Sequence, residues 1–232
     1  MLIIAEIGQN HNGDMAIAKK LISAAKEMGA DIAKFQLYNV DSIFQPDFEW
    51  YKEAKQAQLS REPVADLGNW CQQVGIEFMA SVFDVERVGW CQEIGVKRYK
   101  IASRSIYDTE LINAIAKTGK DIIASLGMYQ GEEFPQINTS AKVDFLYCIS
   151  KYPTKPEDLN FLEIDFNKYS GFSDHTIGIE AAIVAMARGA RIIEKHFTLN
   201  KKMHGPDHST SMEPEELRQL VWFARKIEEI LR

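Results

Sequence analysis

Five serines recur at near-regular intervals in this chain, and two lysines accompany them. Neighbouring serines lie 22 to 25 residues apart, and the whole group comprises Lys34, Ser81, Lys100, Ser103, Ser125, Ser150 and Ser173. Hydroxyl and ammonium groups donate hydrogen bonds and fill little space. Such donors suit a phosphate or a carboxylate. The pattern therefore predicts an oxyanion-binding site.

Histidines form a second chemical group. His175 and His196 each follow an apolar run, and His11, His204 and His208 stand in segments predicted to lie at the same end of the fold. Two neutral imidazoles can share a divalent metal ion, with water and a substrate oxygen in the remaining positions. We therefore predict a metal site at His175 and His196, although two histidines do not select the metal.

Short apolar runs provide the elements that must position these side chains. Candidate strands cover residues 2–8, 32–38, 77–83, 98–103, 121–127, 144–150, 171–176 and 191–197. Their length and their flanking glycines are typical of buried strands. The serines, both lysines and the two metal-site histidines all lie within or at the ends of these runs.

Helical patterns separate the strands. After Asp14, apolar residues recur at the spacing of one buried helix face, and Gly29 closes that helix. The final helix opens with Pro214 in its first turn. The remaining candidate helices cover residues 61–75, 84–95, 108–119, 132–142, 157–168 and 178–189.

Eight strand–helix units in succession favour a (β/α)8 TIM barrel that occupies residues 1–232 as one catalytic domain. An open doubly wound sheet is the alternative, but the chain has no glycine-rich dinucleotide fingerprint. Barrel chemistry takes place at the carboxyl ends of the strands, where the serines, lysines and histidines are predicted. One long insertion, residues 39–60 after the second strand, is expected to form a lid or a partner contact.

Composition narrows the function classes. The 232 residues carry 27 basic and 33 acidic side chains, a net charge of −6 without a basic patch, so nucleic acid is not an expected partner. No apolar run is long enough to span a membrane, and the amino terminus does not resemble a signal peptide. Three scattered cysteines, Cys71, Cys91 and Cys148, favour free thiols in a reducing cytoplasm.

Several motifs together resemble the bacterial sialic acid synthase family. They occur in the family's order over essentially the whole chain: AEIGQNHNGD (5–14), AKFQ (33–36), YKIAS (99–103), SLGM (125–128), YPT (152–154), GFSDHT (171–176), EKHFTL (194–199) and GPDHSTSMEP (205–214). Members are phosphoenolpyruvate-dependent synthases of N-acetylneuraminate and of related nonulosonates such as legionaminate and pseudaminate. The resemblance implies a (β/α)8 barrel.

The resemblance also implies a reaction and a site. Carbon 3 of phosphoenolpyruvate would attack the aldehyde of an open-chain N-acetylated aldose, which a divalent metal, usually Mn²⁺ but also Mg²⁺ or Co²⁺, polarises. The metal would lie at His175 and His196, and the lysine–serine group would bind phosphoenolpyruvate. Gln36, Tyr152 and Asp207 match positions that handle the sugar. We expect catalytic contributions from Lys100, Asp207 and the position of Ser105.

Three departures from the family bear on the acceptor. Ser105 replaces a glutamate, with Arg104 beside it, and a serine cannot act as a carboxylate base. Asn12 replaces the glutamate of some sialate synthases and bears on sugar binding. The family's C-terminal antifreeze-like domain is not expected here, so a homo-oligomer or a separate partner would complete the sugar site. Two alternatives stay open: a related barrel enzyme that uses another aldehyde, and a non-catalytic sugar-phosphate-binding barrel.

Overall fold

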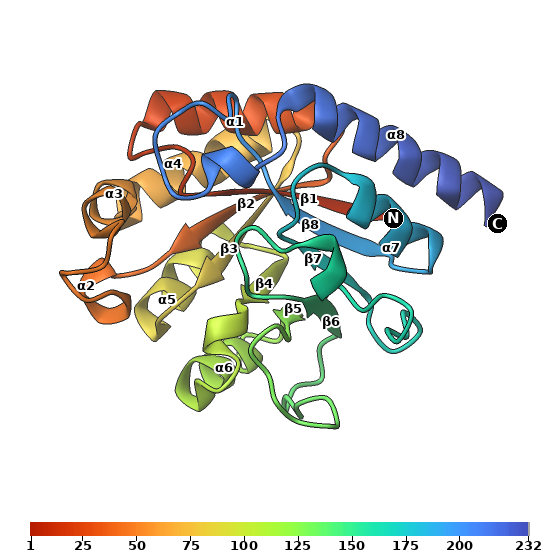
Figure 1. Ribbon diagram of the computed structural model, residues 1–232. Helices are drawn as coiled ribbons and strands as arrows, with labels where there is room; N and C mark the ends of the chain where they lie inside the picture. The colour runs from red at the N-terminus through yellow and green to blue at the C-terminus, as the bar shows by residue number, and fades with distance from the viewer. Residues whose placement is uncertain (232) are drawn as a thin grey trace.

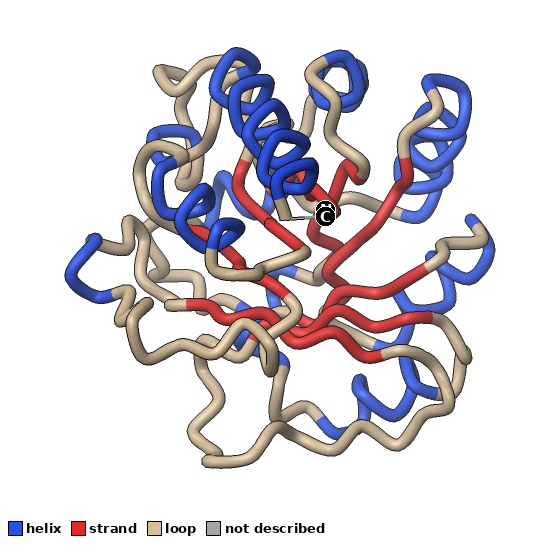
Figure 2. The backbone as a smooth tube through the Cα atoms, turned by 90° about the vertical axis from the view of Figure 1, so that its right-hand side faces the viewer, coloured by secondary structure: helices blue, strands red, loops and turns tan. Residues whose placement is uncertain are grey.

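Parallel strands form the centre of the molecule. The structure, a computed structural model, describes residues 1–231. Within that range eight strands close into a barrel in sequence order (Figures 1 and 2). The predicted (β/α)8 class is thus confirmed. The strands are β1 (Leu2–Gly8), β2 (Ile32–Leu37), β3 (Glu77–Val82), β4 (Arg98–Ile101), β5 (Asp121–Ser125), β6 (Val143–Cys148), β7 (Gly171–Asp174) and β8 (Ile192–His196).

Helices surround much of this barrel (Figure 1). Asp14 begins α1 because its carboxylate accepts hydrogen bonds from the amides of Ala16 and Ile17. Gly75 ends α4 in the left-handed conformation, with φ of 76°. The helices are α1 (Met15–Glu27), α2 (Val40–Ile43), α3 (Tyr51–Ala57), α4 (Arg61–Val74), α5 (Val85–Ile94), α6 (Thr109–Ala116), α7 (Glu180–Ala187) and α8 (Pro214–Ile230), with short 3₁₀ turns η1 (Ser103–Ser105), η2 (Pro156–Asp158) and η3 (His208–Thr210).

Two predicted helices are wrong. Residues 132–142, all described, form neither helix nor strand, because Pro135 lacks an amide hydrogen and disrupts the preceding turn. Residues 157–168 form only the end of η2 and further turns. Asn160 there has a φ of 46°, and the Asp165 carboxylate accepts a hydrogen bond from the amide of Asn167. Such local contacts compete with a helix, so the connections on both sides of β6 are loops.

The barrel interior changes from apolar to polar along the strands. Interior side chains alternate with those that face the helices, and Ile32, Met79, Leu146 and Ile192 belong to one buried cluster inside the barrel. Two positions further along their strands stand Lys34, Ser81, Cys148 and Glu194. The apolar layer therefore fills one end of the barrel, and the next layer gathers polar groups at the other end.

The register of the strands brings these polar groups to one level. Glu6 pairs with Lys34 on one side and with His196 on the other. Ser81 pairs with Lys100, and Ser173 pairs with Glu194. Strands β4 to β8 end earlier than predicted, so Ser103 and Ser150 lie just beyond a strand.

The insertion of residues 39–60 contains α2 and α3. It packs on Tyr38 at the end of β2, and the Tyr38 hydroxyl donates to the carbonyl of Ala54 at 2.8 Å. Phe44 and Phe48 in this segment stack with ring centroids 4.4 Å apart. The insertion therefore forms an ordered aromatic wall beside the barrel mouth. Among residues 1–231, no helix combines the length and the apolar character that a membrane crossing requires.

Candidate active site

A cavity of about 690 Å³ opens where the strands end. Side chains from every strand or from the loop that follows it contribute to its lining. Most of the predicted site residues meet there: Lys34, Gln36, Ser81, Lys100, Ser103, Ser125, Ser150, Tyr152, Ser173, His175, His196 and Asp207. The structure therefore brings these predicted residues together in one cavity.

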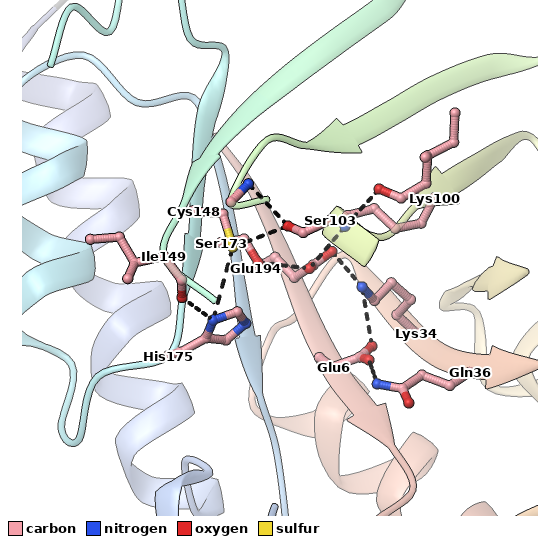
Figure 3. A network of polar contacts seen from close by, with 12 residues as sticks. Glu6, Lys34, Gln36, Lys100, Ser103, Cys148, Ile149, Ser173, His175 and Glu194 are labelled. Atoms are coloured by element: carbon pink, nitrogen blue, oxygen red, sulfur yellow. Dashed lines mark hydrogen bonds and ion pairs between the residues drawn. The ribbon is translucent and has the colours of Figure 1, made fainter. Parts of the chain in front are cut away.

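Glu194 organises the floor of the cavity (Figure 3). Its carboxylate lies 2.6 Å from the ammonium of Lys34 and 3.4 Å from that of Lys100, and it accepts a hydrogen bond from Ser173 at 3.0 Å. Burial alone would raise the pKa of Glu194, but the charges of Lys100 and Lys34 outweigh it and lower the pKa to about 2. Glu194 is therefore an ionised brace.

The two lysines differ in their electrostatic surroundings. Burial opposes the charge of Lys34, but Glu194 and Glu6 outweigh it and raise its pKa. The Glu6 carboxylate lies 3.4 Å from the Lys34 ammonium. Burial lowers the pKa of Lys100, which shares Glu194 with Lys34. Removal from water strengthens both cations as partners for an anion that enters the cavity.

The serines surround a narrow space beside this floor. The Ser125 hydroxyl is buried and has no hydrogen-bond partner among the described residues. The Ser103 hydroxyl accepts the amide hydrogen of Gly127 at 3.1 Å. A Cβ at Gly127 would lie 2.6 Å from the Ser150 hydroxyl and 2.9 Å from the Cys148 sulfur. The unpartnered hydroxyl is free to donate to a ligand group, and the close contacts at Gly127 explain why this turn has no side chain.

His175 and His196 face each other at the cavity wall, with ring centroids 5.9 Å apart. The Nδ1 of His175 lies 2.8 Å from the carbonyl oxygen of Ile149 and donates to it in the neutral ring (Figure 3). Nε2 is then an acceptor, 3.0 Å from the Tyr152 hydroxyl. Burial lowers the pKa of both histidines, which keeps the rings neutral, the form that binds metals.

These two imidazoles fit a divalent metal with two protein ligands. The Nδ1 of His196 is buried without a hydrogen-bond partner in the described part of the chain. A backbone carbonyl fixes the ring of His175, as outer partners of metal-binding histidines do. Residues 1–231 contain no group of three or more His, Cys, Asp or Glu side chains placed for a metal. Water or substrate would therefore complete the coordination.

Two predicted site residues do not line the cavity. Ser105 is buried within η1. Asn12 lies outside the cavity lining and connects two loops by hydrogen bonds. The amide of Asn12 donates to the carbonyl of His204 at 2.9 Å, and its side-chain oxygen lies 3.2 Å from Nε2 of His208. His11, His204 and His208, which the sequence analysis placed at the same end of the fold, do not line the cavity.

Other cavity residues received no role from the sequence. Glu6, Glu194 and Lys195 were visible as polar residues at strand ends, but their partners depend on the barrel register. Lys195 and Asp174 form a buried ion pair of 3.0 Å. The aromatic wall of the insertion contributes Phe44, Phe48 and Trp50 to the lining. In the sequence, the only signal for these three residues was the long insertion in which they lie.

Fold and site together define a (β/α)8 barrel protein with an oxyanion floor and a histidine pair at one mouth. The model of the NeuB family matches residues 21–232, and the chain belongs to this family. It is 36% identical to an N,N'-diacetyllegionaminic acid synthase from Legionella pneumophila, over 99% of this chain and 72% of that protein. It is also 36% identical to the human N-acetylneuraminate-9-phosphate synthase, over 99% of this chain and 70% of that protein.

Solved structures agree with this assignment. A crystal structure of N-acetylneuraminic acid synthetase from Leptospira borgpetersenii in complex with citrate superposes with a TM-score of 0.92 at 36% identity, covering 99% of this chain and 84% of that one. A truncated 3-deoxy-D-arabino-heptulosonate 7-phosphate synthase from Thermotoga maritima gives a TM-score of 0.71 at 14% identity, covering 100% of this chain and 87% of that one. The second likeness concerns the fold alone.

Proposed function

We propose that this protein condenses phosphoenolpyruvate with an open-chain N-acetylated aldose to give a nonulosonic acid and phosphate. Carbon 3 of phosphoenolpyruvate forms a bond to the aldehyde carbon, and water adds at carbon 2. The bond between carbon 2 and the phosphate oxygen then breaks. One proton of the water ends on the new hydroxyl and the other on the released phosphate, so the reaction balances without a redox partner.

One observation carries this proposal: an oxyanion floor and a histidine pair share one cavity. Lys34, Lys100 and the serines provide charge-assisted donors for the phosphate and carboxylate of phosphoenolpyruvate. His175 and His196 stand beside them on β7 and β8. Two reactants held in one cavity gain from fixed proximity and orientation. The relatives named above are synthases of legionaminic and neuraminic acids, which supports a nonulosonic acid as the product class.

The histidine pair would hold a divalent metal, for which we propose Mn²⁺, with Mg²⁺ or Co²⁺ as substitutes. A bound metal of this kind polarises an aldehyde oxygen. Gln36 and Tyr152 would orient the acceptor, because both line the cavity near the pair; Gln36 donates to Glu6 at 2.9 Å. Ser105 does not line the cavity. Of the four carboxylates that do, Glu6 and Asp207 lie beside His196 and would accept or return a proton there.

Phosphate release tests the function. The protein is incubated with Mn²⁺, phosphoenolpyruvate and a panel of N-acetylated hexosamines, and the keto acid product is measured by mass spectrometry. We expect stoichiometric phosphate and product with at least one sugar. Absence of both with every sugar would refute the proposal, whereas turnover of other aldehydes alone would favour a related barrel enzyme. A second chain that completes the sugar site stays a prediction.

A further inference from the structure

Arg104 is the cavity cation without a carboxylate partner among residues 1–231. The other cavity cations each lie within 3.4 Å of a carboxylate, Lys34 and Lys100 at Glu194 and Lys195 at Asp174. Arg104 lines the same cavity, but its guanidinium makes no ion pair. A guanidinium group without an ion-pair partner is suited to bind a carboxylate or a phosphate.

Neighbouring groups fix the position of this guanidinium. One nitrogen, Nη2, donates to the carbonyl of Ile43 at 2.9 Å. The guanidinium carbon lies 5.2 Å from the ring centre of Phe44 and 6.0 Å from that of Phe83. These contacts come from the insertion and from the residue that follows β3, and they leave the other nitrogens without a hydrogen-bond partner among residues 1–231. A fixed fork loses less entropy when it binds an oxyanion.

Depth separates Arg104 from the oxyanion floor. Lys34 and Lys100 are each only 2% exposed, whereas Arg104 is exposed at the cavity mouth. Arg104 follows β4, and His196 ends β8, four strands away in the closed ring. The two side chains therefore enter the cavity from opposite sides. An acceptor with its aldehyde at the histidines would extend its far end toward Arg104.

We infer that the acceptor carries an oxyanion, a phosphate or a carboxylate, at the end remote from its aldehyde, and that Arg104 binds it. This inference rests on the proposed function and names the substrate class of that site. Phe44, Phe48 and Trp50 would cover the carbon chain of the acceptor between the two ends. Ser105 beside Arg104 contributes no opposing charge, so the arginine stays available.

Acceptor preference tests the inference. The assay contains Mn²⁺ and phosphoenolpyruvate and compares three acceptors: N-acetylmannosamine, its 6-phosphate and the corresponding uronate. Each acceptor is tested with wild type, Arg104→Gln and Arg104→Lys. We expect wild type to prefer one anionic sugar, and the pair of anionic sugars shows whether the oxyanion is a phosphate or a carboxylate. Arg104→Gln should lower the ratio of kcat/KM for that sugar to kcat/KM for the neutral one roughly 10- to 100-fold, with Arg104→Lys between.

Controls distinguish binding from support of the insertion. Arg218→Gln removes an exposed arginine on α8 and should keep the wild-type ratio. A wild type that prefers the neutral sugar would overturn the inference while the proposed function stands. Equal losses for all sugars in Arg104→Gln would assign a supporting role only, and a higher KM for phosphoenolpyruvate alone would place Arg104 at the other substrate. No turnover with any sugar would refute both proposals.

Discussion

Among single residues, Lys34 is the most constrained charge in the cavity, because it lies between Glu194 and Glu6. Lys34→Ala removes a charge-assisted donor, so we expect the KM for phosphoenolpyruvate to rise roughly 10- to 100-fold. It also removes the ion pair of Glu6 and the shorter of the two ion pairs of Glu194, both of them buried carboxylates, which lowers the free energy of unfolding by roughly 3 kcal/mol. Steady-state kinetics and urea unfolding measure the two effects.

Lys142→Ala is the matched control for that variant. Lys142 pairs with Asp144 at 2.7 Å, but it precedes β6 at the other end of the barrel. We expect its KM to equal that of wild type. A wild-type KM in a folded Lys34→Ala protein would exclude Lys34 from the oxyanion site.

His11 makes the fold sensitive to acid. Burial lowers its pKa from 6.5 to about 4 in the folded state. The unfolded chain therefore takes up the proton first as the pH falls, so this stability is full above pH 6.5 and declines toward pH 4. Between pH 6.5 and 5 the free energy of unfolding should fall by roughly 2 kcal/mol from this group. Urea unfolding across this range should show a shallower slope for His11→Gln, and an unchanged slope would contradict the assignment.

Among the elements, the turn after β5 has the tightest packing at the site. A Cβ at Gly127 would lie within 3.0 Å of Ser150, Cys148 and Ser103. Gly127→Ala should therefore displace these groups and raise the KM for phosphoenolpyruvate at least several-fold. Steady-state kinetics checks this expectation. Gly89→Ala is the control, because open space surrounds Gly89 within α5 and alanine favours a helix by about 1 kcal/mol.

Some of the correctly predicted helices have strong local signals at one end. Asp14 and Gly75 mark helix ends with side-chain and backbone chemistry that acts within a few residues. The two segments wrongly predicted as helices had apolar residues without such caps. Pro135 in one and the left-handed Asn160 in the other disfavour a helical backbone. Site residues on strands were found because strand ends meet at one barrel mouth. Ser105 and Asn12 lie in turns that follow strands. The sequence does not specify the direction in which a side chain in such a turn points.

Long-range pairing could not be predicted in the same way. Glu194 contacts Lys34 and Lys100 because the closed register brings β8, β2 and β4 to one level. That register depends on all eight strands together. The sequence therefore identified the polar residues of the floor but not which of them neutralise one another, and the unpaired state of Arg104 became visible only with the fold.

At the scale of the whole molecule, metal binding should couple to stability. A ligand that binds only the folded state at a hundred times its Kd adds about 2.7 kcal/mol. For a chain of this length Mn²⁺ should then raise the Tm by roughly 5 to 10 °C. His196→Ala should lose this shift in a thermal scan. His204→Ala should keep it, because His204 is outside the cavity lining, and a shift retained in His196→Ala would refute the metal site.

The helix-free connections around β6 have a consequence for the whole barrel. Aromatic rings cover this flank: Phe134 lies 4.9 Å from Phe145 and 4.8 Å from Tyr169, centre to centre. Packed rings exclude water, but they do not supply the backbone hydrogen bonds of a helix. We therefore expect local opening of this flank to be more frequent than opening of the flank covered by α4 and α5. Deuterium would then enter residues 131–142 first. Cys148 and Ser150 lie at the end of β6 and line the cavity, so opening of this flank would let solvent reach the site from the side of the barrel.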